Sequence, residues 1–199
     1  RKRRKLAKGQ GGKEAIKLQH AKGRLTLRER IDLLLDEGSF EEQGEIAGGS
    51  EIDEQGKLES LTPANFILGF GKINNKNVVV GGEDFTVKGG SPNPAGLRKS
   101  VYTEDLALKY KVPLIRLHEG GGGSVAGPGK KSSGYGGDPV FSKSRFKSLA
   151  DTLREIPVAS AALGPVAGMP AARFVGSHFR VMTKETAQIL VAGPTVVER

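Results

Sequence analysis

Apolar positions at helical spacing predict a short amphipathic helix early in the chain. An apolar stripe over 31–35 follows Thr26 and Glu29, which have the spacing of a capping box. In that motif the threonine hydroxyl and the glutamate carboxylate each accept a hydrogen bond from a free backbone N–H. Gly38 stands where the helix is expected to end, as glycine often does. The apolar stripe is the face by which we expect this helix to dock onto a core.

Apolar runs further along the chain predict an antiparallel hairpin. Residues 66–73 and 78–80 have strand character, and the turn 74–77 between them contains three asparagines, which tolerate positive φ. The run 81–87 is also strand-like, whereas the acidic, glycine-containing stretch 41–61 predicts a loop with one short strand.

The second half of the chain repeats an order of strand, glycine-rich turn and helix. This order implies parallel pairing through right-handed crossovers, and short apolar strands are typical of a sheet covered on both faces. The sequence therefore predicts an α/β fold. The expected elements are a helix to about Lys109, a strand over 112–117, a glycine-rich loop over 120–137, a helix over 146–156, a strand over 158–163, a turn over 164–168 leading into a helix, strands over 180–182 and 188–191, and a helix beginning at Gly193 and Pro194.

Positive charge is concentrated at the N-terminus. The formal net charge is +9, and six basic side chains lie within residues 1–8. A terminal run of this kind is usually a solvated arm or a partner-binding tail. We therefore expect a loose basic arm over 1–20, helical near 14–19, followed by one domain over 21–199. The chain begins with Arg1 rather than methionine, which predicts processing or trimming.

Composition argues against several functions. Without cysteine, the chain has no disulfide, thiolate zinc site or cysteine nucleophile. None of the three histidines has a metal-ligand partner three or four residues further on, so no metal is expected. Nucleic-acid-binding motifs and a run of about 18 apolar residues are both lacking, so we expect neither nucleic acid nor a membrane span. The basic surface serves equally well to attract an anionic ligand.

Glycine turns after two predicted strands carry the candidate chemistry. Glycine lets the backbone come close to a ligand, and free N–H groups at a helix start favour negative charge. The turns after Leu117 and Leu163 could aim N–H donors at one point, forming an oxyanion hole; the alternative is that they are only turns. A Walker phosphate loop is not matched, because Ser124 and Lys131 replace required residues of that motif.

His118 and Glu119 end a predicted strand beside the glycine-rich loop. Catalytic groups often lie at such a place, so a proton-transfer role and a structural role are both open for His118. No G-x-S-x-G elbow precedes a helix, so a hydrolase triad has no support.

Four collinear segments resemble the carboxyltransferase (β) subunit of biotin-dependent acyl-CoA carboxylases, the propionyl-, methylcrotonyl- and acetyl-CoA carboxylase group. Residues 20–34 resemble the opening motif of the family, and residues 84–91 are similar to its D-F-T-V-x-G-G-S stretch. Residues 164–168 are similar to its G-P-x-A-G-G turn, and residues 191–197 to its F-x-T-G-P-x-V-V segment. The first two of these four segments are the most specific.

The resemblance implies the N-terminal part of such a subunit, with a partial crotonase-like (ClpP/crotonase) fold of repeated ββα units. It implies that carboxyl-biotin on a carrier domain supplies CO₂, and that an acyl-CoA is carboxylated at its α or γ carbon through an enolate held by backbone N–H groups. It further implies homo-oligomers formed through partner C-terminal carboxyltransferase domains, a biotin carboxylase and biotin carrier subunit, and a bacterial cytoplasm or mitochondrial matrix. The domain would continue past Arg199, and this part alone would not turn over.

The resemblance also transfers residue roles. The enolate oxygen would be held by main-chain N–H groups of Gly121 and Gly122 in the first turn and of Gly168 and Met169 in the second. The family's D-S-G-G-A-R is replaced here by residues 119–124, which removes its arginine, and Met169 replaces a glycine. The expected acyl-CoA contacts are Lys22 and Arg24, for the phosphates, and Phe85, Gly89 and Gly90 in the second motif. No metal is implied.

Two other functions stay open at this point. A different crotonase-type enzyme, such as a hydratase or decarboxylase, would need an acidic base near the second turn, and 164–176 contains no acid. A non-catalytic scaffold of the same fold is favoured by the altered first glycine motif.

Overall fold

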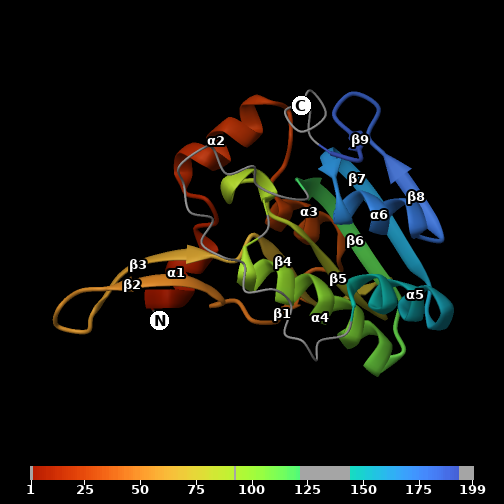
Figure 1. Ribbon diagram of the computed structural model, residues 1–199, viewed down its shortest axis with the longest axis horizontal. Coiled ribbons are helices and arrows are strands. Elements are labelled where there is room, and N and C mark those ends of the chain that lie inside the picture. The colour runs from red at the N-terminus through yellow and green to blue at the C-terminus, as the bar shows by residue number, and fades with distance from the viewer. Residues whose placement is uncertain (1, 92, 122–143, 193–199) are drawn as a thin grey trace.

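The protein is built on one seven-stranded mixed sheet flanked by helices (Figure 1). The structure, a computed structural model, describes residues 2–91, 93–121 and 144–192. The elements in chain order are α1 (Lys2–Lys8), α2 (Lys13–Ala21), α3 (Leu27–Leu34), β1 (Glu41–Glu42), β2 (Gly48–Ile52), β3 (Leu58–Pro63), β4 (Phe66–Ile73), β5 (Lys76–Glu83), the 3₁₀ turn η1 (Lys88–Gly90), α4 (Pro94–Tyr110), β6 (Leu114–Gly120), α5 (Arg145–Glu155), β7 (Val158–Ala167), α6 (Met169–Gly176), β8 (Phe179–Met182) and β9 (Gln188–Leu190).

The central strands follow the order predicted from the sequence. β4 and β5 form the expected antiparallel hairpin, and Asn74 and Asn75 in its turn have φ of 50° and 64°. β5, β6 and β7 then pair in parallel, as the strand–turn–helix order predicts. β8 and β9 both pair with β7, one after the other along the same edge. The predicted α/β fold is confirmed.

Alternation along the buried strands places helices on both faces of the sheet. Val79 packs with α4 and α5 in one apolar cluster, whereas its neighbours Val78 and Val80 pack with Leu27 and Ile31 of α3 in another. Successive side chains of a strand point to opposite faces, so α3 covers one face and α4 and α5 cover the other (Figure 1). The capping box of α3 is present as predicted.

The strands that lead to the glycine turns are longer than predicted. β6 ends at Gly120 and not at Leu117, and β7 ends at Ala167 and not at Leu163. The predicted turn over 164–168 is therefore wrong for 164–167, which continue β7 beside β9. A Cβ on Gly164 would lie 2.4 Å from the Glu119 carboxylate. Glycine at this position of β7 therefore leaves space for the buried carboxylate of Glu119 on the neighbouring strand β6.

The N-terminal segment is ordered rather than loose. The predicted helical part near 14–19 lies within α2, but residues 2–8 also form a helix, α1. Ala7 is buried, Lys2 Nζ donates a hydrogen bond to the Leu58 carbonyl at 2.6 Å, and Arg4 pairs with Glu45. These contacts dock α1 against β3, one strand of a β2–β3 hairpin that projects from the body (Figure 1). The loop with one strand predicted over 41–61 therefore contains a hairpin.

In the part of the chain that the structure describes, no helix has the length and apolar character needed to cross a bilayer.

Candidate functional site

The two glycine turns lie next to one another at the carboxyl ends of neighbouring strands. Gly120 at the end of β6 pairs with Val166 near the end of β7. Gly121 and Met169, the residues just beyond, line the same narrow cavity of about 30 Å³. Ligands of open α/β sheets bind at the carboxyl ends of the strands, and the parallel pairing of β6 and β7 brings the turns to such a position.

Gly168 and Met169, the two residues of the second turn, differ in backbone conformation. Gly168 is the N-cap of α6 with φ 67° and ψ −133°, a conformation that a side chain would strain. Met169 is the first residue of the helix and is not among the residues with positive φ, so the methionine that replaces the family's glycine is accommodated. As a first-turn residue, its N–H has no acceptor within the helix. The Gly168 N–H donates to the Val191 carbonyl at 3.1 Å.

The turn at 88–90 forms another wall of this cavity. Gly90 has φ 69°, and a Cβ on it would lie 2.7 Å from the Gly120 Cα. Asn65 Nδ2 donates to the Gly90 carbonyl at 2.8 Å and fixes the turn. Gly90 therefore lines the cavity with Gly121 and Met169. Gly89 also has positive φ, 64°, but does not line it. The predicted Gly122 lies outside the described residues.

Arg24 is held inside the protein and not on its surface. Its Nη1 lies 2.8 Å from Glu119 Oε1, and its guanidinium stacks over the half-buried Phe85 ring at 5.1 Å. Arg30 and Gln19 Nε2 contact Glu119 Oε2 at 2.6 Å and 2.8 Å. A buried carboxylate is costly unless it is paired and hydrogen-bonded. Arg24 therefore holds Glu119, directly before the first turn, and Phe85 stacks against Arg24.

Sequence reasoning missed this Glu119 cluster. Gln19, Arg24 and Arg30 lie about 90 to 100 positions before Glu119 in the chain, and no local pattern marks such a pairing. Lys22, the other predicted phosphate ligand, is exposed.

His118 has a structural position. It is fully buried, and its Nδ1 lies 3.0 Å from Glu83 Oε2. It does not line the cavity, although Glu83 does. Burial by itself would raise the pKa of Glu83, but nearby His118, Arg116 and Arg173 outweigh burial and lower it. Of the two interpretations of His118, the geometry favours the structural one.

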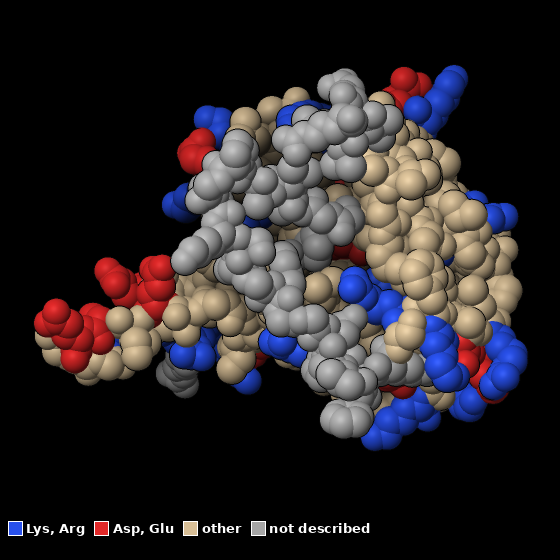
Figure 2. Space-filling model, viewed as in Figure 1, with Lys and Arg blue, Asp and Glu red and all other residues tan. Residues whose placement is uncertain are grey.

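A wider apolar groove adjoins the cavity. It measures about 860 Å³ and shares Arg145 and Met169 with the cavity. Its other walls come from α6 and the β9 region, including Ala172, Val175 and Leu190. Figure 2 shows mainly uncharged atoms over α6, β7 and β8. Exposed apolar side chains of that region include Val175, Phe179, Val181 and Met182.

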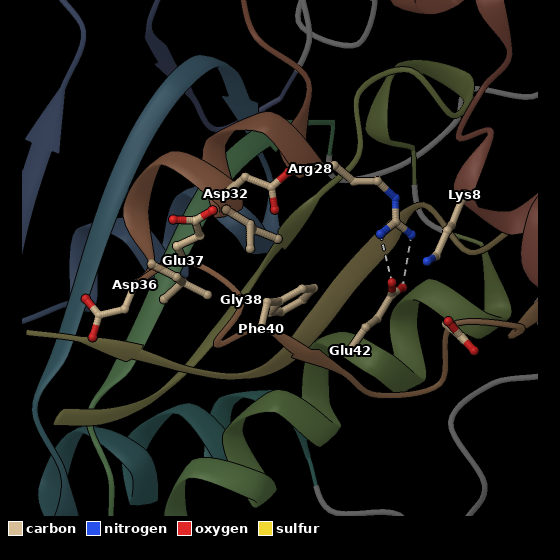
Figure 3. Close-up of a pocket in the computed structure, with 11 residues that line it drawn as sticks. Lys8, Arg28, Asp32, Asp36, Glu37, Gly38, Phe40 and Glu42 are labelled. Atoms are coloured by element: carbon tan, nitrogen blue, oxygen red, sulfur yellow. Dashed lines mark hydrogen bonds and ion pairs between the residues drawn. The ribbon is translucent and has the colours of Figure 1, made fainter. Parts of the chain in front are cut away.

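A second hollow, of about 710 Å³ between α3 and β1, is distinct from this site because its lining shares no residue with the cavity. Arg28 and Glu42 form a bidentate pair there, at 2.8 and 3.1 Å (Figure 3). Five carboxylates line the hollow against two basic side chains. Such a balance repels an anionic ligand, so this hollow is a poor candidate for one that carries phosphates.

Within the described ranges, no group of three or more histidine or acidic side chains is placed to hold a metal ion.

Fold and site together define an α/β domain in which two glycine-containing turns meet at the carboxyl ends of neighbouring parallel strands. A family profile described as the carboxyl transferase domain matches residues 18–199. The chain belongs to the carboxyl transferase domain family, and its fold is the crotonase-like fold expected for that family.

Its relatives include subunits of acyl-CoA carboxylases and decarboxylases. The propionyl-CoA carboxylase beta chain of Roseobacter denitrificans is 34% identical over 196 residues, which cover 98% of this chain and 37% of that protein. The mitochondrial propionyl-CoA carboxylase beta chain of Homo sapiens is 33% identical over 190 residues, 94% of this chain and 34% of that one. The methylmalonyl-CoA decarboxylase subunit alpha of Veillonella parvula is 30% identical, covering 98% and 37%.

Solved structures share the fold. The transcarboxylase 12S structure with methylmalonyl-coenzyme A and methylmalonic acid bound has a TM-score of 0.73 at 24% identity, covering 99% of this chain and 37% of that chain. A single-chain, multi-domain long-chain acyl-CoA carboxylase has a TM-score of 0.76 at 25% identity, covering 99% and 20%. The chain thus spans little more than a third of the length of the curated relatives that it matches.

Proposed function

We propose that this chain supplies the acyl-CoA half of a carboxyltransferase site, in which main-chain N–H groups at the two glycine turns hold the thioester oxygen as an enolate forms. The supporting observation is the shared cavity of Gly121 and Met169. N–H donors at a helix N-terminus stabilise developing negative charge without reorganisation, because the protein fixes them in advance.

The carbon next to the thioester carbonyl would lose a proton, and its electron pair would move to the thioester oxygen. Carboxyl-biotin on a carrier domain would supply the CO₂ to which this carbon then bonds, and the ureido nitrogen that loses the CO₂ would take up the proton. The acyl chain is proposed to follow the apolar groove along α6, where Val175 and Leu190 face it.

Basic side chains near α2 are proposed to bind the coenzyme phosphates. The exposed Lys22 follows α2, and Lys88 is exposed beside the cavity wall formed by Gly90. Arg24 pairs with Glu119, so we do not include it among the proposed phosphate contacts.

The partners are proposed from the resemblance and from the exposed apolar face. A homo-oligomer through partner C-terminal carboxyltransferase domains would cover side chains such as Phe179 and Met182, which are 63% and 50% exposed. A biotin carboxylase and biotin carrier subunit would deliver the carboxyl group. The proposed compartment is a bacterial cytoplasm or a mitochondrial matrix.

Calorimetric titration with propionyl-CoA tests the proposal. Met169→Pro removes one N–H at a helix position where proline fits, and Met169→Leu is the matched control that keeps it. The lost hydrogen bond is expected to weaken binding about 3- to 10-fold in the proline variant, with little change in the leucine variant. If the folded wild-type chain did not bind propionyl-CoA, the proposal would fail and a scaffold role would replace it.

A further inference from the structure

A buried arginine with a free donor faces the cavity that the proposed function uses. Arg173 lies on α6 and is 2% exposed. Its Nε donates to Glu104 Oε1 at 2.9 Å and its Nη1 to Ser100 Oγ at 3.3 Å. Its Nη2 is buried and has no hydrogen-bond partner among the described residues. Arg173 also lines the cavity, so a ligand there is one available acceptor, and Glu104 Oε2, buried without a partner among the described residues, is another.

The fold does not need Arg173 to neutralise Glu104. Arg116 is just as buried and contacts the same Glu104 Oε1 through its Nη2 at 2.5 Å. Two guanidinium groups therefore share one carboxylate oxygen. Glu83 is a second carboxylate close to this pair, and Arg116 and Arg173 both lower its pKa.

Arg173 and one carboxylate, Glu83, line the cavity, and Glu83 Oε2 is already bonded to His118. The first turn of α6, at Met169 and Pro170, lines it as well and adds the positive end of a helix dipole.

We propose that Arg173 Nη2 donates to a carboxylate in this cavity, that of an acyl-CoA carboxylated on the carbon next to the thioester. The inference rests on the proposed function. Only on that carbon does a carboxylate lie close enough to the thioester for one narrow cavity to serve both: the amides of Gly121 and Met169 hold the thioester oxygen, and Arg173 holds the new carboxylate. A γ-carboxylated product would carry its carboxylate too far away.

Affinity for a matched pair of ligands tests this inference on the full chain. Methylmalonyl-CoA and propionyl-CoA differ by the carboxylate alone, so calorimetry should show methylmalonyl-CoA binding about 10- to 100-fold more tightly, the range for a charge-assisted hydrogen bond. Arg173→Met should abolish this preference and keep the affinity for propionyl-CoA. Arg116→Met removes an equally buried partner of Glu104 that does not line the cavity, so it should keep the preference.

The outcomes separate the two proposals. A wild-type chain that binds neither ester fails both. Equal affinity for the two esters in the wild type, which needs no variant, would leave the proposed function standing and overturn the carboxylate site, as would an equal loss of preference in both arginine variants. Titration of sodium bicarbonate into the wild type and Arg173→Met tests whether Arg173 binds a free anion instead of the carboxylate of an acyl-CoA. Arg173-dependent binding of bicarbonate without a preference for methylmalonyl-CoA would overturn the α-carboxylated acyl-CoA.

Discussion

Lys99 shows how burial of one residue makes the stability of this fold depend on pH. It lies on α4, is 8% exposed, and its Nζ lies 3.3 Å from the Gly44 carbonyl and 4.0 Å from Glu42 Oε1. Burial lowers the pKa of Lys99 from 10.5 to about 8, Glu42 opposes this and Arg28 adds to it. The folded protein therefore holds the neutral amine in a pH range where the unfolded chain is still protonated.

The sign of the pH dependence follows from this difference. Between pH 8 and 10.5 the unfolded chain binds more protons at Lys99 than the folded one, so the free energy of unfolding rises with pH. At about 1.4 kcal/mol per pH unit, the interval from about 8 to 10.5 gives up to about 3 kcal/mol. Urea unfolding across this range should show that rise for the wild type relative to Lys99→Met. Lys72→Met, at an exposed lysine, should track the wild type, and parallel curves for wild type and Lys99→Met would contradict the account.

The sequence located some site residues and could not locate others. Gly121 and Met169 lie together because each comes shortly after one of two neighbouring parallel strands, and the order of these strands, though not their exact ends, could be predicted from the apolar pattern. Arg173 was missed because its partner Glu104 lies 69 positions away on another helix. Arg24 was predicted as a phosphate contact, and its pairing with Glu119 could not be foreseen because the pattern of a single segment contains no sign of Glu119.

At the scale of elements, α3 links the N-terminal segment to the sheet. The Thr26 side chain accepts from the Glu29 N–H, and the Glu29 carboxylate accepts from the Thr26 N–H at 2.7 Å. The helix then places Ile31 in the core and Arg30 against Glu119. The cap therefore supports the cluster that precedes the first glycine turn.

Loss of this cap has a measurable cost. Thr26→Ala should lower the free energy of unfolding by about 1 kcal/mol, because it removes the cap acceptor. Thr26→Ser keeps the hydroxyl and should lie closer to the wild type. Urea titration of the three proteins gives the comparison, and an alanine variant as stable as the wild type would show that the cap carries no stability.

The ends of elements were the least predictable from the sequence. The sequence predicted a strand over 78–80 that runs into a strand-like stretch over 81–87, whereas β5 ends at Glu83. Position 82 requires glycine, because a Cβ there would lie 2.1 Å from the Leu117 carbonyl. This close approach of a neighbouring strand is a long-range contact that no local pattern reveals.

At the scale of the whole molecule, the order of elements predicted the α/β fold but not the arrangement of its edges. Parallel pairing of β5, β6 and β7 follows from their crossover helices. Nothing in the sequence indicated that β8 and β9 would share one edge of β7, or that β1 would pair with β4. The edges depend on long-range contacts, and one of them leaves Phe179 and Met182 exposed.

We propose that main-chain amides at the ends of β6 and β7 polarise a thioester. Infrared difference spectroscopy of propionyl-CoA labelled with ¹³C at the thioester carbonyl measures this directly, since hydrogen bonds to the oxygen weaken the C=O bond. We expect a stretching frequency below that in buffer for the wild type and Met169→Leu, with part of the shift lost in Met169→Pro. A bound ligand whose carbonyl frequency equals that in buffer in all three proteins would show that these amides do not polarise the thioester.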